Sequence, residues 1–96
     1  MTEIKVVIKE PGKYPYMAKI SNTLEALQQI VGGYIETVTF CSDMVIICNE
    51  EGRLRGLPHN VNFCGVDFCG PIIFAGVDGE EFTDVPFNLI PRELVS

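Results

Sequence analysis

Two short, uninterrupted apolar runs constrain the fold of this chain more than any other feature. They occupy residues 44–48 and residues 72–75. Runs of this length are shorter than a buried helix needs, and they lack the polar alternation of a strand with one face in water. They fit strands that are covered on both faces. We therefore expect both runs in the middle of a sheet.

The outer strands of this sheet are predicted by alternation and by residue type. Residues 3–9 alternate between two faces, as a half-buried strand does. A Pro11-Gly12 turn then leads into a second short strand at residues 16–20, which we expect to pair back on the first. Residues 34–41 are rich in aromatic and β-branched residues and predict an edge strand.

One helix is predicted at residues 23–31. Its apolar positions recur at helical spacing and form one stripe: Leu24, Leu27, Ile30 and Val31. We expect Asn22 to cap the N-terminus while Glu25 reaches back to the cap, and Gly32-Gly33 to end the helix. The stripe indicates a helix that covers one face of the sheet.

Turn signals punctuate the second half of the chain. Residues 49–52 and 76–79 predict turns, and residues 53–56 a short paired strand. Residues 57–70 combine proline, glycine and asparagine with a repeated Phe-Cys-Gly triplet, so we expect an irregular loop with aromatic anchors. A short helix is expected near residues 91–95.

Together these elements predict an α+β fold in a single domain over residues 1–96. We expect a mainly antiparallel sheet of about five to six strands with one helix packed on a face.

Charge, hydropathy and cysteine content narrow the function classes. The net charge of −6 repels a phosphate backbone, so we expect no nucleic-acid partner. The apolar runs are far shorter than the ~20 residues of a membrane span, and the N-terminus lacks a signal-peptide pattern. We expect a cytoplasmic protein with no membrane partner, whose four cysteines are reduced thiols. No motif predicts a cofactor or a catalytic set.

The turn and loop residues after the first apolar run form a candidate ligand site. Side-chain amides, charges and turn residues converge there beside an apolar wall. The set is Tyr34, Asn49, Glu50, Arg53, Arg55, Pro58 and Asn60. The alternative is that these residues only build turns and satisfy loop backbone groups, which asparagine and glycine do routinely.

A weaker candidate is a metal site. Cys64 and Cys69 enclose four residues, His59 lies just upstream, and Cys48 offers a fourth ligand. Against a zinc site, the chain has no tight Cys-x-x-Cys pair, and buried cysteines commonly pack as small hydrophobes. His59 could also act as a base for a Cys64 nucleophile, although one histidine near a cysteine arises readily by chance.

Three blocks along the chain carry a family resemblance. They are ALQQIVGGYIE at residues 26–36, CNEEG at 48–52 and GLPHN at 56–60. With these blocks the chain resembles DUF3846, a family of uncharacterised small domains. The resemblance implies a phage or mobile-element context and assigns no activity. Where the family pattern has arginine after the asparagine matching Asn60, this chain has Val61, so an anion-binding role there would need Arg53 or Arg55.

Two function classes follow, and the sequence leaves them open. The first is a non-catalytic binding module that captures a small molecule, such as a nucleotide-like signal, or a host protein through residues 49–70, with Phe63 and Phe68 available for stacking. The second is a protein-interaction or homo-oligomeric assembly module without a small-molecule ligand. In either case we expect a homo-oligomer. An enzyme using Cys64 or His59 is a third, less supported option.

Overall fold

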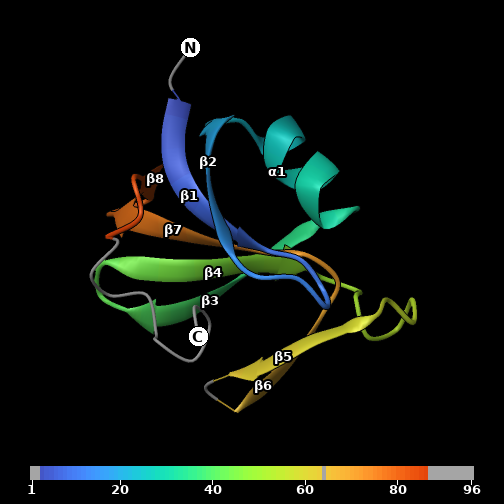
Figure 1. Ribbon diagram of the computed structural model, residues 1–96. Coiled ribbons are helices and arrows are strands. Elements are labelled where there is room, and N and C mark those ends of the chain that lie inside the picture. Colours follow the sequence, from blue (N-terminus) through green and yellow to red (C-terminus); the bar gives the residue numbers. More distant parts are fainter. Residues whose placement is uncertain (1–2, 64, 87–96) are drawn as a thin grey trace.

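A twisted antiparallel sheet forms the centre of the molecule, with a helix on one face and a two-stranded hairpin on the other (Figure 1). The computed structural model describes residues 3–63 and 65–86. The elements in chain order are β1 (Glu3–Lys9), β2 (Tyr16–Ser21), α1 (Leu24–Val31), β3 (Ile35–Cys41), β4 (Met44–Asn49), β5 (His59–Phe63), β6 (Val66–Cys69), β7 (Ile72–Asp78) and β8 (Glu81–Thr83). The predicted α+β class is confirmed.

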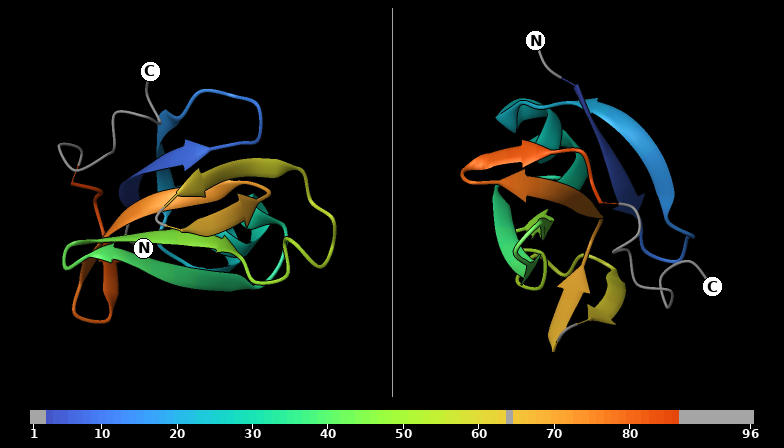
Figure 2. Two further views of the ribbon diagram at one scale, coloured as in Figure 1. Left: turned by 90° about the horizontal axis from the view of Figure 1, so that it is seen from below. Right: turned by 90° about the vertical axis from the view of Figure 1, so that its left-hand side faces the viewer.

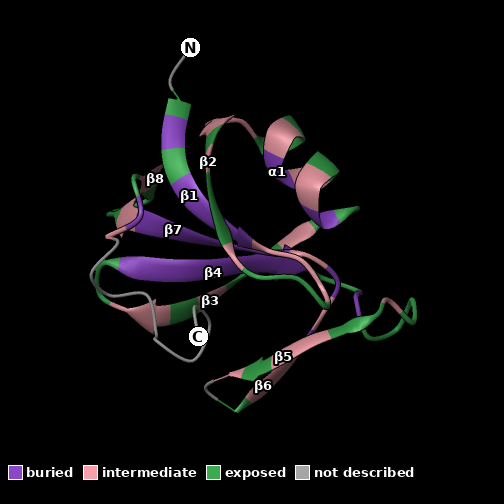
Figure 3. Ribbon diagram, viewed as in Figure 1, coloured by how far each residue is buried: buried purple, intermediate pink, exposed green. Residues whose placement is uncertain are grey.

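The two apolar runs lie in the middle of the sheet, as predicted. Its strand order is β2-β1-β7-β4-β3, and β8 pairs with the end of β7. All six residues of β4 are buried, and so are the first five of β7, so both strands are drawn mainly in purple in Figure 3. In the register between them, Ile46 lies opposite Phe74. Every pairing among the described strands is antiparallel.

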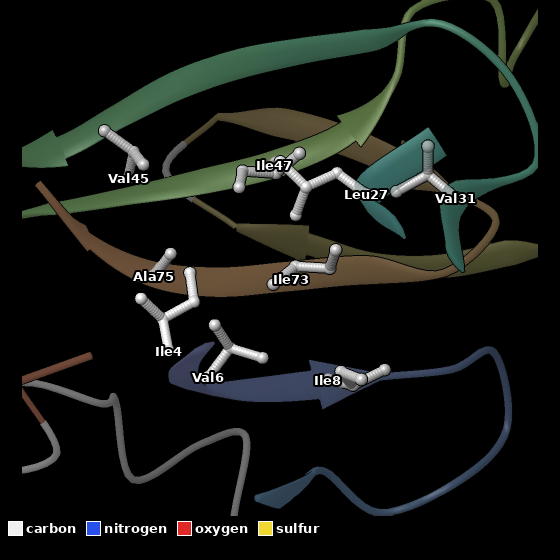
Figure 4. Close-up of a cluster of buried hydrophobic side chains, with 9 residues drawn as sticks. All are labelled: Ile4, Val6, Ile8, Leu27, Val31, Val45, Ile47, Ile73 and Ala75. Carbon is white, nitrogen blue, oxygen red and sulfur yellow. The ribbon is translucent and has the colours of Figure 1, made fainter. Parts of the chain in front are cut away.

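Helix α1 covers one face of the sheet. Leu27 and Val31 point from the helix onto residues of β1, β4 and β7, and together they form the helix-side core (Figure 4). The N-cap differs from the prediction: the Thr23 side chain accepts a hydrogen bond from the Ala26 N–H at 3.2 Å. Asn22 instead donates to the Phe82 carbonyl, because β8 lies within its reach.

The β5–β6 hairpin covers the opposite face of the sheet (Figure 2). The prediction of an irregular loop over residues 57–70 was therefore wrong for most of that segment. The inward residues of the two strands alternate along the chain: Val61, Phe63, Val66 and Phe68. They pack with the buried residues of β4 and β7 on this face, and we call this cluster the hairpin-side core. This alternation places the residues between them on the outer side of the hairpin.

Three further predictions differ from the structure or lie outside it. Residues 53–56 form turns, in which the Arg55 N–H donates to the Glu51 carbonyl at 2.8 Å, so no strand forms there. Strand β7 continues to Asp78, which places the turn later than predicted, and β8 was not foreseen. The helix expected at residues 91–95 lies outside the described residues. Among the described helices, none has the length and apolarity required to cross a membrane.

Candidate functional site

A groove opens between the turn that follows β4 and strand β6 of the hairpin. Its volume is about 530 Å³, which is the size of a small-molecule site. Buried residues form its floor: Cys48, Asn49, Gly52 and Phe68. Exposed or half-buried residues form its rim: Glu36, Glu50, Arg53, Leu54, Val66, Asp67 and Cys69. We call this hollow the β6 groove.

Asn49 fixes the turn that forms one wall of the groove. The residue is 6% exposed, and both polar atoms of its side chain make hydrogen bonds. Nδ2 donates to the Val31 carbonyl at the end of α1 at 3.1 Å, while Oδ1 accepts from the Glu51 N–H at 2.7 Å. The amide therefore joins the helix end to the turn, and it is not free to bind a ligand.

Gly52 lets this turn lie directly against the hairpin. A Cβ atom at this position would lie 2.6 Å from the backbone oxygen of Cys69, closer than real Cβ atoms approach. The Gly52 N–H donates to the Asn49 carbonyl at 3.2 Å, which closes the turn. A glycine is therefore required where the two walls of the groove meet.

The rim of the groove is predominantly acidic. Glu36, Glu50 and Asp67 contribute three carboxylates, and Arg53 contributes one guanidinium. The formal charge of these lining groups is therefore −2. A hollow lined with one sign of charge attracts ligands of the other sign. The β6 groove thus favours neutral or cationic ligands over anions.

The structure brings three of the seven predicted ligand residues to the groove. Asn49, Glu50 and Arg53 line it, whereas Tyr34, Arg55, Pro58 and Asn60 do not. The exposed Tyr34 contributes its carbonyl to the Glu50 N–H, at 2.9 Å. Arg55 pairs with Glu51 on the surface at 3.4 Å, and the Pro58 carbonyl accepts from the Gly70 N–H at 2.8 Å.

Asn60 has a structural role at the base of the hairpin. Its Nδ2 donates to the carbonyls of Lys9 and Gly70, at 2.7 and 2.8 Å, and its Oδ1 accepts from Lys9 Nζ at 3.0 Å. The side chain thus attaches the start of β5 to the end of β1. This is the backbone-satisfying alternative that the sequence left open for asparagine.

The two phenylalanines expected to stack on a ligand belong to the core. Phe68 is 2% exposed, and Phe63 stacks on Phe40 with ring centroids 5.3 Å apart. Phe63 also meets the edge of Phe74, at a centroid distance of 6.5 Å. Both rings pack the hairpin against the sheet. They thereby cover an apolar face of the sheet that would be open to water without the hairpin.

A family model matches almost the whole length of the chain. The family model described as "Domain of unknown function (DUF3846)" matches residues 4–93. The chain belongs to the DUF3846 family. No curated protein and no solved structure matches it significantly.

The predicted metal set is altered in the DUF3846 structure. His59 and Cys69 do come together, but the third donor beside them is Asp67. Cys64 lies outside the described residues. The Cys48 Sγ donates to the Glu36 carbonyl at 3.6 Å and is not part of this group. A His–Asp–Cys group can hold a metal ion or orient an imidazole beside a thiol.

Several groove residues were missed by sequence reasoning. They are Glu36, Leu54, Val66 and Asp67, whereas Gly52 was expected in the turn, Phe68 as a stacking ring, and Cys48 and Cys69 as candidate metal ligands. A signal for the residues of β6 was present, because residues 66–69 alternate between apolar and polar or small side chains. Recognition of this short strand would have placed Asp67 and Cys69 on the same outer side of the hairpin.

Cys48 is predicted to be chemically inert in the folded DUF3846 chain. Burial, together with repulsion from the Glu36 carboxylate, raises the pKa of the Cys48 thiol to about 11. Two pKa units correspond to a roughly 100-fold smaller thiolate fraction near neutral pH. The raised pKa means that the protonated thiol stabilises the folded chain relative to the unfolded chain. This stabilisation is fully present below the ordinary thiol pKa and is lost as the pH rises toward 11.

Alkylation with iodoacetamide at about pH 8.5, followed by peptide mass spectrometry, tests this prediction. Cys41 and Cys69 are free and partly exposed, so they should be labelled first. Cys48 should be labelled only after unfolding in urea. Labelling of Cys48 in the native protein as fast as that of Cys41 would contradict the prediction.

Proposed function

We propose that this DUF3846 chain is a binding module that takes up a small molecule in the β6 groove. The supporting observation is the combination of a 530 Å³ hollow with a buried floor and a charged rim. Ligand sites commonly pair an apolar wall with a few polar groups that set orientation. Here Leu54 and Val66 supply apolar surface, while the charged rim side chains supply polar groups.

The charge of the rim selects the class of ligand. Three carboxylates face one guanidinium, so a neutral or positively charged polar molecule is favoured, such as an amine. A nucleotide-like ligand of the kind suggested by a phage or mobile-element context would have its phosphate met by Arg53 alone among the lining residues. We therefore rank a cationic ligand above a nucleotide.

An NMR titration tests the proposal and its charge preference together. The ¹⁵N-labelled protein is titrated with spermidine, adenosine and AMP at about 150 mM salt, where surface charges are largely screened. We expect spermidine to shift amide signals of residues 48–54 and 66–69, and AMP to shift them far less. The absence of shifts at these residues with all three probes would count against the proposal.

A matched pair of variants distinguishes binding in the β6 groove from non-specific attraction to an acidic surface. Glu36→Gln combined with Glu50→Gln removes two rim charges, whereas Glu80→Gln combined with Glu81→Gln removes two charges from a second acidic hollow near β8. Loss of spermidine shifts in the first variant alone supports the β6 groove. Equal loss in both variants would indicate non-specific attraction to an acidic surface.

Assembly into a homo-oligomer is a second candidate, favoured by the edge strand β2. Within residues 3–63 and 65–86, β2 pairs with β1 alone. Large side chains are exposed along or beside it, with Tyr14 78%, Tyr16 46% and Met17 48% exposed. An open edge with exposed apolar side chains is a site for strand pairing between copies.

Light scattering tests this candidate. We expect the wild-type chain to be a dimer and Met17→Lys, which places a charge on the edge strand, to be a monomer. A wild-type chain that is monomeric at every concentration would contradict the candidate.

A further inference from the structure

The outer side of the β5–β6 hairpin carries three donors of different chemistry close together. One donor atom from each of His59, Asp67 and Cys69 lies within 4.8 Å of the other two. The His59 Nδ1 and Asp67 Oδ1 are 2.8 Å apart. The groups are accessible, since the His59 side chain is 61% and the Asp67 side chain 40% exposed, and Cys69 is partly exposed.

The pairing of the two strands explains why the three donors meet. His59 and Cys69 are direct partners across the ladder, and Asp67 precedes Cys69 by two positions. Residues two apart on a strand share a face, so Asp67 and Cys69 project together. Phe68 between them is buried against the sheet, which fixes the direction of its neighbours. The register shift between His59 and Val61 lets His59 share this side although Val61 packs inward, so strand pairing alone brings the three residues together.

We propose that His59, Asp67 and Cys69 form a binding site for a Zn²⁺-like divalent ion. An imidazole nitrogen, a carboxylate oxygen and a thiolate sulfur are the donors that zinc takes, at about 2.0–2.3 Å from the ion. Tetrahedral bonds of that length separate neighbouring donors by about 3.4 Å. This value lies between the 2.8 Å that separates His59 Nδ1 from Asp67 Oδ1 and the 4.8 Å within which all three donors lie. A thiolate among the donors selects zinc over the hard cations magnesium and calcium.

The charges and the position of the site are consistent with a bound dication. One carboxylate and one thiolate balance two positive charges, and the imidazole binds as a neutral ligand. Asp67 and Cys69 also line the β6 groove, so a fourth, non-protein ligand would approach from the groove. The metal proposal does not depend on the small-molecule proposal, because the donors meet through hairpin pairing alone.

Cobalt(II) is the probe that tests the site, because its absorption spectrum reports thiolate ligation. The full chain is titrated with Co²⁺ under a non-thiol reductant. We expect one equivalent to bind with a thiolate-to-cobalt charge-transfer band, which excess Zn²⁺ abolishes. The band should be lost in Cys69→Ser, and His59→Ala should weaken binding by at least about 100-fold. The absence of a charge-transfer band at a roughly tenfold excess of Co²⁺ would overturn the proposal.

Two control variants show whether the loss is specific to these donors. Cys41→Ser removes a partly exposed thiol that is not part of the group, and Asp78→Asn removes an exposed carboxylate at the end of β7. Both should bind Co²⁺ as the wild type does. A band that persists in Cys69→Ser, or that vanishes equally in Cys41→Ser, would assign the metal to other residues. Retained amide spectra of each variant show that folding is intact.

Discussion

Replacing Phe74 with alanine is expected to lower the free energy of unfolding by about 3–5 kcal/mol, the usual cost of removing a buried aromatic ring. Phe74 is fully buried in β7, among the hairpin-side core residues. Its ring also makes an edge-type contact with the ring of Phe63, which belongs to the hairpin. The substitution therefore leaves a cavity and loosens the hairpin from the sheet.

Urea unfolding followed by circular dichroism measures the Phe74→Ala effect. Val77→Ala, on the same strand but half-buried, is the control and should cost about 1 kcal/mol. Hydrogen exchange in Phe74→Ala should increase more in β5 and β6 than in α1, because α1 packs on the other face. Equal losses of stability in the two variants would show that the Phe74 side of the sheet is not a packed core.

The Asn49→Asp substitution is the second change with a large expected effect, a loss of about 3 kcal/mol at neutral pH. The side chain keeps its acceptor for the Glu51 N–H, but the donor to the Val31 carbonyl becomes a carboxylate oxygen. Two oxygens then face each other in a buried place, and a charge has been introduced without a partner. The turn that forms one wall of the β6 groove should loosen first.

The pH dependence of Asn49→Asp identifies the cause of the loss. Burial raises the pKa of the introduced carboxyl above its value in the unfolded chain, so the protonated form is favoured by folding. The deficit should therefore grow as the pH rises and shrink under acidic conditions, where the carboxylic acid can again donate. Asn62→Asp, at an exposed position opposite Asp67, should cost less than about 1 kcal/mol. A pH-independent deficit would contradict this explanation.

The centre of the fold could be predicted from the sequence, because its signal is local. Strands that are covered on both faces require uninterrupted apolar runs, and residues 44–48 and 72–75 are such runs. Likewise, the stripe on α1 follows from helical spacing. The cap was misassigned by one residue, because Asn22 and Thr23 are both good caps. Asn22 donates to the Phe82 carbonyl, while Thr23 accepts from the Ala26 N–H, and these contacts distinguish the two residues.

The hairpin could not be predicted in the same way, because the glycine and asparagine residues of this segment predict turns and loops, and its two strands are short. Residues 57–70 are rich in turn formers, and β5 and β6 contain only five and four residues. Their inward side chains are stabilised by packing on the far face of the sheet, a tertiary contact that no local pattern shows. The same hidden register explains why Asp67 was missed beside His59 and Cys69.

The candidate ligand site was predicted in part, for a related reason. The turn residues Asn49, Glu50 and Arg53 lie at the groove, since a turn that follows a buried strand lies at the edge of the core. Whether a given polar side chain is free depends on its partners in space. Asn49 and Asn60 are occupied by backbone groups from α1, β1 and the hairpin, which the sequence does not reveal.

Four of the seven rim residues of the β6 groove take no part in the packing that holds the fold together. Glu36, Glu50, Arg53 and Leu54 are all solvent-exposed, and none contributes to either core cluster. Substitutions at such positions usually change stability by no more than about 0.5 kcal/mol. The side chains at these four positions can therefore be exchanged for others of different charge and shape, while the sheet beneath them stays unaltered.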